Sequence, residues 1–293
     1  MGRFNPVLLF SILFIFVWST GFTVGKFILP HADTTLFLVV RTAIAATMFG
    51  AIALYLRLPW PAWAMVPRHL LAGVLLQGVY LAGTYWAIGL GVPPAIMALL
   101  GALQPILTAV LAMPILGEHP SRNVWWGLAL GLCGVAMVIQ PGLQAGAQAA
   151  FGWAGLLIGL LAILSITLGT LLQKTSIASV DIRVSAALQN LGAMLFTGIS
   201  VLFIDDLYWD NSLPLWGALI WASFVLSGVG AFLLVWLVRR GQAAKVSSLM
   251  FLAPPLAALQ AYFLFDDLLG AVQMVGFLIA LSGVVLCNWR WRA

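Results

Sequence analysis

Apolar residues fill nearly the whole chain in runs of about 20, and short polar connections separate the runs. A helix needs about 20 apolar residues to cross a hydrocarbon layer about 30 Å thick. By this measure the sequence predicts ten membrane-spanning helices. The first run is long and no small-residue cleavage site follows it, so we expect an uncleaved helix rather than a secretory signal. The ten predicted spans are residues 6–29, 34–56, 67–89, 93–116, 122–140, 152–176, 183–205, 213–238, 245–265 and 270–289.

The composition agrees with an all-α integral membrane protein. Hydrophobic residues make up 63% of the chain and charged residues 7%, and the mean hydropathy is +1.10. Soluble domains hold roughly 45–50% and about 25% of these classes. The connections are too short for a separate soluble catalytic domain. Both cysteines, Cys133 and Cys287, lie inside apolar runs, so we expect no disulfide framework.

The charged residues predict the orientation in the membrane. Lysine and arginine fall in or beside alternate connections, and the loops on the other side carry aspartates instead. The positive-inside rule then predicts a multi-pass membrane protein with both termini in the cytoplasm. This sorting explains the net charge of +5 without a nucleic-acid partner. The basic residues concerned are Arg3, Arg57, Arg68, Arg122, Lys174, Arg183, Arg239, Arg240, Lys245, Arg290 and Arg292.

A weak internal repeat runs through the chain. Pro105 and Pro255 stand 150 positions apart, and Trp86 and Trp236 share this offset. Glycines 127 and 134 match glycines 276 and 283 at an offset of 149. A unit of five spans written twice places the second copy upside down, and inverted repeats are a transporter architecture. We therefore predict two inverted five-helix repeats, 1–141 and 152–293, around a central cavity.

Prolines interrupt the fourth and ninth predicted helices at matching positions. Pro105 lies near the centre of the fourth helix, and Pro254 and Pro255 lie near the centre of the ninth. Proline removes a backbone bond to the carbonyl four residues earlier. Paired interruptions of this kind point to a binding site between the repeats. The alternative is a kink that only shapes helix packing. The carbonyls that we expect to lose their donors are those of Gly101, Met250 and Phe251.

Polar and aromatic side chains on two helices add to the candidate cavity. Helical spacing places residues 77, 80 and 84 on one face of the third helix, and residues 19, 23 and 26 on one face of the first. The alternative is that such groups bond neighbouring helices without any ligand. The predicted substrate-binding residues are Trp18, Ser19, Thr23, Arg41, Gln77, Tyr80, Thr84, Gln104, Pro105, Pro254 and Pro255.

Two basic residues within or near the spans need separate consideration. Arg41 stands seven residues into the second helix, about 10 Å below its end at 1.5 Å per residue. Intramembrane basic residues are candidates for an anion site or a gate, and the alternative is snorkelling to the interface. We assign Lys26 to gating or ion pairing on this basis. Glu118, Asp266 and Asp267 are further ion-pair candidates at helix ends.

The chain resembles the drug/metabolite transporter superfamily in WSTGFTVGK (18–26) and ALLGALQPILTAVLAMPILGE (98–118). The resemblance spans the ten helices and is strongest to EamA-type exporters, especially the inner-membrane aromatic amino-acid exporters. It implies export of amino acids, other metabolites or drugs through a central cavity by alternating access. It also implies an acidic residue at the end of the second proline helix, where Asp266 and Asp267 stand.

Several motifs are missing from the sequence. No phosphate-binding glycine-rich motif is present, and the three histidines show no metal-ligand spacing, so we expect no cofactor and no metal. No carboxylate lies in the middle of a span, which argues against proton coupling through an embedded acid. An intramembrane enzyme is a less favoured alternative, because no embedded nucleophile with a base is found.

We therefore expect a transporter of small molecules that works in the lipid bilayer, with a monomer sufficient for transport. A sugar-phosphate or nucleotide-sugar antiporter is the alternative within transport. That function needs several cations in the cavity, and the sequence offers Arg41 and Lys26.

The predicted topology can be tested by labelling introduced cysteines from outside the cell. Thiols placed in 141–151 and 206–212 should react with an impermeant reagent, and thiols in 57–67 and 239–244 should not. Labelling of the second pair would contradict both the orientation and the inverted repeat.

Overall fold

The computed structural model describes residues 6–28, 30–92, 94–140, 152–175, 179–204, 207–240, 243–265 and 270–288. Within these ranges the chain is helical and has no β-strand, only an isolated bridge between Ala32 and Trp209. Eight described segments are long and apolar enough to cross a membrane. Two shorter apolar helices, Pro6–Gly21 and Arg122–Val138, fall in the first and fifth predicted spans. The all-helical membrane fold is confirmed, and the count of ten spans stays a prediction.

The chain forms two compact units. Unit 1 comprises Met1–Ala82 and Leu168–Arg240, and unit 2 comprises Gly83–Thr167 and Gly241–Ala293. Each unit combines helices from both halves of the sequence, so grouping by contacts does not follow the predicted repeats. The repeat boundaries, 1–141 and 152–293, therefore remain a prediction from sequence.

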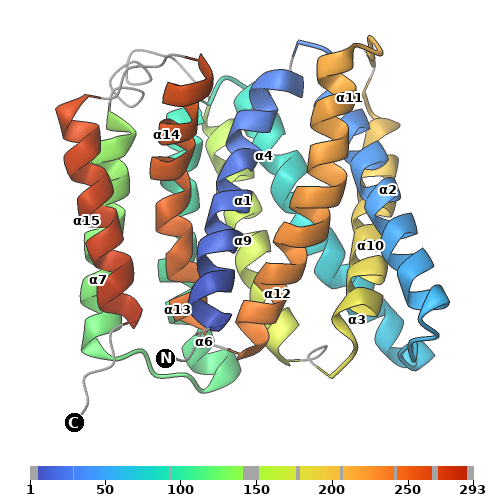
Figure 1. The fold of residues 1–293 in the computed structure, drawn as a ribbon, viewed down its shortest axis with the longest axis horizontal. Helices are drawn as coiled ribbons and strands as arrows, with labels where there is room; N and C mark the ends of the chain where they lie inside the picture. Colours follow the sequence, from blue (N-terminus) through green and yellow to red (C-terminus); the bar gives the residue numbers. More distant parts are fainter. Residues whose placement is uncertain are drawn as a thin grey trace, which may run out of the picture. The chain divides into compact units, whose positions relative to one another are not determined.

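Unit 1 contains most of the polar residues at membrane depth. Aspartate side chains cap two of its helices: the carboxylate of Asp33 accepts from the Leu36 amide (2.8 Å), and that of Asp181 accepts from the Arg183 amide (2.9 Å). Helices α4 (Tyr80–Gly89) and α9 (Trp153–Thr175) are each divided between the two units. The other elements of unit 1 are α1 (Pro6–Ile28), α2 (Thr34–Tyr55), η1 (Trp63–Met65), α3 (Val66–Gly73), η2 (Val74–Val79), α10 (Ile182–Val201), α11 (Leu213–Ile220), η3 (Trp221–Gly230) and α12 (Ala231–Arg240) (Figure 1).

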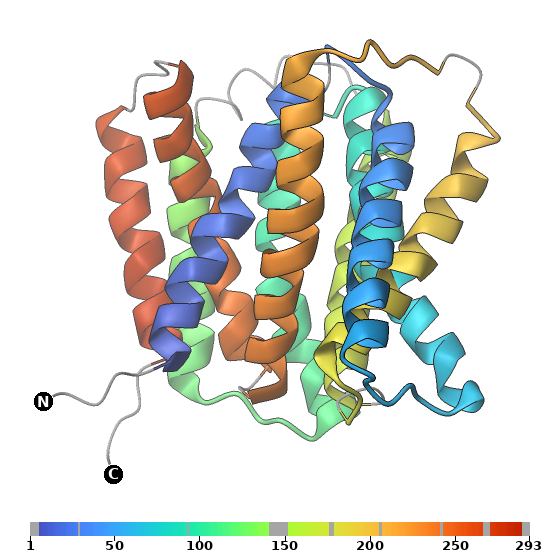
Figure 2. The ribbon, with the colours of Figure 1, turned by 45° about the vertical axis from the view of Figure 1, so that its right-hand side comes forward.

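Helix α10 is the centre of packing in unit 1, where it contacts α2, α3 and η2. The crossing of α3 and α10 brings two backbones together. A Cβ atom on Gly73 would lie 1.8 Å from the Gln189 carbonyl oxygen, and one on Gly192 would lie 2.2 Å from the Leu70 carbonyl oxygen. Only glycine permits this approach. On another side of the unit, α1 runs alongside the continuous orange helix formed by α11, η3 and α12 (Figure 2).

Two segments of unit 1, η2 and η3, are π-helical. Most helices contain no π turn, and those that do often have it at a functional site. Residues 74–79 of η2, moved by the repeat offset of 150, fall on 224–229 inside η3. The same irregularity therefore occurs at equivalent positions of the two predicted repeats.

Unit 2 contains the proline-interrupted helices. A single residue, Leu103, separates helix α5 (Pro94–Ala102) from α6 (Gln104–Leu116). The Leu103 amide donates to the Leu100 carbonyl (3.0 Å). Helix α13 (Ala243–Ser248) passes into the 3₁₀ turn η4 (Leu249–Leu252) immediately before α14 (Ala253–Phe265). Helix α6 ends at Gly117, which adopts a left-handed φ of 66°. The remaining helices are α7 (Arg122–Val138) and α15 (Ala271–Asn288).

One expectation about the prolines is wrong. Pro254 has no amide hydrogen to donate to the Met250 carbonyl. This carbonyl accepts instead from the Ala253 amide, three residues after Met250. Tightening of the backbone to a 3₁₀ turn supplies the missing bond within the chain. This carbonyl is therefore not left open for a substrate.

Helices α7 and α15 pack face to face (Figure 1). A Cβ atom on Gly127 would lie 2.6 Å from the Gly283 carbonyl oxygen, and one on Gly134 would lie 2.7 Å from that of Gly276. Rising numbers on α7 meet falling numbers on α15, so the helices are antiparallel. The repeat offset relates Gly127 to Gly276 and Gly134 to Gly283. Gly127 therefore contacts the repeat equivalent of Gly134, and Gly134 contacts the repeat equivalent of Gly127. A two-fold relation between inverted copies produces this reciprocal pattern.

The contact between α7 and α15 predicts a specific sensitivity. Gly134→Ala would place its Cβ atom 2.3 Å from the Ala280 amide nitrogen, and it should cost about 1–3 kcal/mol as overpacking does elsewhere. Gly50→Ala in α2 is the matched control, because no neighbouring atom lies within 4 Å of its added Cβ atom. Thermal unfolding in detergent should show a lower Tm for Gly134→Ala alone, and equal Tm values would contradict the packing argument.

Candidate functional site

A buried chain of three polar side chains crosses unit 1 at the π-helical segments. Arg41 of α2 donates through Nε to the Ser227 hydroxyl of η3 (2.8 Å). That hydroxyl donates to Oε1 of Gln77 in η2 (3.3 Å). The exposed fractions are 9% for Arg41, 1% for Ser227 and 8% for Gln77. A charged group at this depth is costly unless it is paired or functional.

Ser227 holds the chain together because its oxygen accepts from one neighbour and its hydrogen goes to the other. The bond to Nε fixes the plane of the Arg41 guanidinium. A guanidinium in a fixed plane presents a geometry that matches a carboxylate, which can bind it through two parallel hydrogen bonds. The arrangement can therefore recognise an anionic group of a small molecule.

Gln77 and Ser227 are also equivalent positions of the predicted repeat, because they stand 150 residues apart. Equivalent residues of two related copies touch each other only near the axis that relates the copies. Sequence reasoning selected Arg41 and Gln77, but Ser227 is not among the eleven predicted residues. Ser227 can be found from the sequence by adding the repeat offset of 150 to the position of Gln77.

A π turn lies within the predicted face of the third helix. The expectation that Gln77, Tyr80 and Thr84 share one face assumed regular α-helical spacing, whereas η2 closes bonds over five residues. Tyr80 and Thr84 are half-buried in α4, after the π turn. Tyr80 belongs to unit 1 and Thr84 to unit 2.

The candidates on α1 have different surroundings. Trp18 is half-buried and packs against Phe14, with ring centroids 5.4 Å apart. Ser19 is fully buried, and its hydroxyl donates to the Phe16 carbonyl within the same helix (2.8 Å). Thr23 and Lys26 lie in α1, but their side chains fall outside the part of the structure that is described.

The proline-helix candidates all lie in unit 2. Gln104 and Pro105 are buried at the start of α6, and the Thr108 hydroxyl donates to the Gln104 carbonyl (2.8 Å). Pro255 is buried and Pro254 is half-buried in the first turn of α14. Glu118 follows the left-handed glycine at the end of α6. Asp266 and Asp267 lie outside the described residues.

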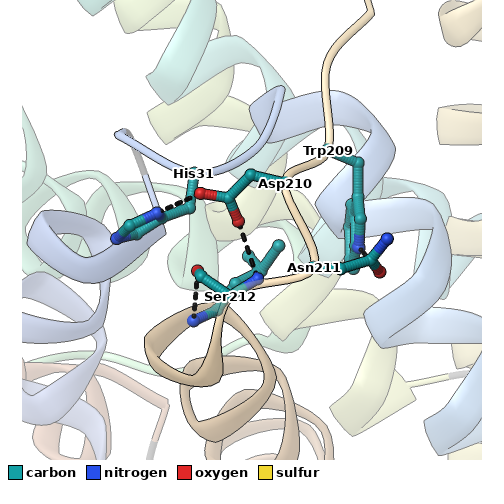
Figure 3. A network of polar contacts seen from close by, with 6 residues as sticks. His31, Trp209, Asp210, Asn211 and Ser212 are labelled. Atoms are coloured by element: carbon teal, nitrogen blue, oxygen red, sulfur yellow. Dashed lines mark hydrogen bonds and ion pairs between the residues drawn. The ribbon is translucent and has the colours of Figure 1, made fainter.

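A second set of contacts joins two loops of unit 1 (Figure 3). Nδ1 of His31 and a carboxylate oxygen of Asp210 are 2.5 Å apart, and the Asp210 amide donates to the His31 carbonyl (3.0 Å). The Ser212 amide donates to the other Asp210 oxygen (2.9 Å). The hydrogen bond from His31, followed by that from the Ser212 backbone, holds the pKa of Asp210 below its usual value. We name the contacts among His31, Asp210 and Ser212 the loop clasp.

The chain is similar to known membrane transporters over nearly its full length. The sequence profile of the EamA-like transporter family matches residues 5–140 and 153–289. An "uncharacterized transporter" of Synechocystis sp. is 29% identical over 94% of this chain and 87% of its own. A "probable amino-acid metabolite efflux pump" of Escherichia coli is 25% identical over 100% of this chain and 98% of its own.

A solved crystal structure has the same fold. It superposes with a TM-score of 0.79 and covers 97% of both chains at 19% identity. At this identity the likeness supports the helical architecture and carries no information about the substrate.

The loop clasp predicts a pH dependence of stability. A carboxylate whose pKa is lower in the folded than in the unfolded state adds stability above the unfolded pKa, and this stability is lost as pH falls through the folded pKa. Below about pH 4 the Tm of the wild type should therefore fall more steeply than that of Asp210→Asn. At pH 7 the variant should have the lower Tm. Parallel curves from pH 7 to acid would contradict the role assigned to Asp210.

Proposed function

Because the chain belongs to the EamA-like transporter family, we propose that it exports amino acids and related small metabolites across the inner membrane by alternating access. Membership of this family makes the protein a multi-pass membrane transporter. The nature of the substrate, the direction of transport and the cytoplasmic placement of both termini belong to the proposal. A single chain holding both repeats is proposed to be the complete transport unit.

The observation that carries the proposal is the chain Arg41–Ser227–Gln77. A buried arginine whose plane is fixed by a serine suits the carboxylate that every free amino acid carries. Gln77 adds an amide, which offers both donors and an acceptor to a polar ligand. The names of the Escherichia coli and Salmonella typhimurium relatives, "probable amino-acid metabolite efflux pump", support the same class of substrate.

The π turns support a moving site. A π segment has a poorer fit to the regular helical ladder, so it is a place where a helix can change register at modest cost. Both η2 and η3 lie at the Arg41–Ser227–Gln77 chain, because they supply Gln77 and Ser227. We propose that the two segments shift during transport and alter the grip on the substrate carboxylate.

The proposal is tested by exchange in proteoliposomes with a matched pair of substrates. The panel contains labelled phenylalanine and phenylethylamine, which lacks the carboxylate, together with a sugar phosphate. The wild type should exchange phenylalanine faster than the amine. Arg41→Gln should lower phenylalanine exchange about tenfold or more, as expected when a charge-assisted pair is lost, and should leave exchange of the amine nearly unchanged.

The matched control is Arg68→Gln. Arg68 is an exposed arginine in α3, and within the part of the chain that the structure describes its side chain donates to the Met65 sulfur (3.5 Å). The Arg68→Gln variant loses the same charge from the same unit, and it should exchange both substrates at the wild-type rate. Equal losses for phenylalanine and phenylethylamine in a folded Arg41→Gln protein would rule out the carboxylate contact. Preferred exchange of the sugar phosphate would favour the antiporter instead.

A further inference from the structure

A second serine of η3 is buried without a partner for its hydroxyl. Ser223 is fully buried, and within the described residues its Oγ atom has no hydrogen-bond partner. Buried hydroxyls elsewhere in unit 1 bond within their own helix: those of Thr42 and Thr197 each donate to the carbonyl four residues earlier (2.7 and 2.9 Å). An unpaired hydroxyl at membrane depth is costly. The presence of Ser223 therefore needs a reason other than packing.

Ser223 lies on the side of η3 that contacts Arg41. Ser227, four residues further along, accepts from Nε of Arg41 (2.8 Å). Because the bonds of a π helix close over five residues, residues four apart lie nearly one above the other. The apolar cluster that joins the two helices contains the neighbours of both residues, namely Phe37, Val40 and Ile44 from α2, and Leu219, Ala222, Val225 and Leu226 from α11 and η3.

The predicted repeat relates the same two positions to a close helix contact. The capping aspartates of α2 and α10 stand 148 residues apart, and this offset relates Arg41 to Gln189. The offset of 150 relates Ser223 to Gly73. A Cβ atom on Gly73 would lie 1.8 Å from the Gln189 carbonyl oxygen. The repeat therefore predicts a close approach of Ser223 to Arg41, and it places a hydroxyl beside the arginine where the other copy has a glycine.

We propose that Ser223 is a second binding residue for the substrate carboxylate, next to Arg41. This inference rests on the proposed function, because it adds a contact to the same site. A carboxylate has two oxygens that accept several hydrogen bonds, so it can bind a guanidinium and a hydroxyl together. Hydrogen bonds to a charged group are stronger than those between neutral groups. The bound carboxylate thus gives the Ser223 hydroxyl the acceptor that it otherwise lacks.

The charge of Arg41 determines which group of the substrate Ser223 binds. A substrate ammonium next to the guanidinium would be repelled, whereas a carboxylate is attracted. No carboxylate of the chain lies in the middle of a span to reverse this preference. The π segment η3 carries both Ser223 and Ser227, so a shift of η3 would change the hydroxyl contact and the support of Arg41 together.

Equilibrium binding to the purified full-length protein tests the proposal with three labelled probes. Phenylalanine carries both charged groups, phenylpropionate lacks the amine, and phenylethylamine lacks the carboxylate. Ser223→Ala should weaken binding of the two carboxylates about tenfold or more, because one charge-assisted hydrogen bond is lost. Binding of phenylethylamine should stay at the wild-type level, which also shows that the variant is folded. The Tm of Ser223→Ala without a probe should equal or exceed that of the wild type, since alanine removes an unpaired buried hydroxyl.

The matched control is Thr197→Val. It also removes a buried hydroxyl from unit 1, but one whose bond stays within α10. This variant should bind all three probes as the wild type does.

Three results would overturn the proposal. Unchanged carboxylate affinity in Ser223→Ala, with or without a lower Tm, would give Ser223 a packing role. Weaker binding of phenylethylamine but not of phenylpropionate would place Ser223 at the ammonium instead. A wild type that binds phenylalanine no better than phenylethylamine would refute the carboxylate site of the proposed function and this inference with it. The wild-type comparison therefore separates failure of the proposed function from failure of the Ser223 contact alone.

Discussion

Hydrocarbon contains no water, so every interruption of a helix in this protein must find its hydrogen bonds inside the protein. The break before Pro105 uses a bond from Leu103 to Leu100, and the break before Pro254 uses a bond from Ala253 to Met250. The π segments η2 and η3 are a different departure from the α-helix, and their places are occupied by hydrogen-bonded polar side chains. Backbone irregularity and polar side chains therefore occur together, and this combination distinguishes the candidate site from the rest of the apolar bundle.

Glycine makes the second contribution, because it lets helix backbones touch. At the crossings of α3 with α10 and of α7 with α15, a Cβ atom in place of the glycine hydrogen would lie 1.8–2.8 Å from a carbonyl oxygen. The helices of the first crossing also carry the hydrogen-bonded side chains of His69 and Ser185, and the second crossing holds none of the predicted site residues. Similar glycine packing thus occurs beside polar contacts in unit 1 and in an apolar helix pair in unit 2.

The sequence predicted the helical segments well because a run of about 20 apolar residues has few alternatives in a membrane. It also located both proline breaks, since proline imposes them locally. The π turns were missed because they have no residue signature, and Gln77 and Tyr80 were placed on one face by assuming an α-helix. Ser227 is recognisable from the sequence as a polar residue at membrane depth, but its bond to Arg41, 186 residues away, has no sequence signal. The bonds that join Gln173, Gln189, Ser185 and His69 are equally hidden, since these residues come from three helices.

The contact between Gln77 and Ser227 bears on how such a chain can arise from a duplicated half. If both halves were identical, Gln77 would face a second glutamine at position 227. A glutamine amide cannot reproduce the serine hydroxyl, which accepts from Nε of Arg41 and donates to Gln77 through a single oxygen atom. The link between Arg41 and Gln77 therefore depends on the two halves being different at this pair of positions.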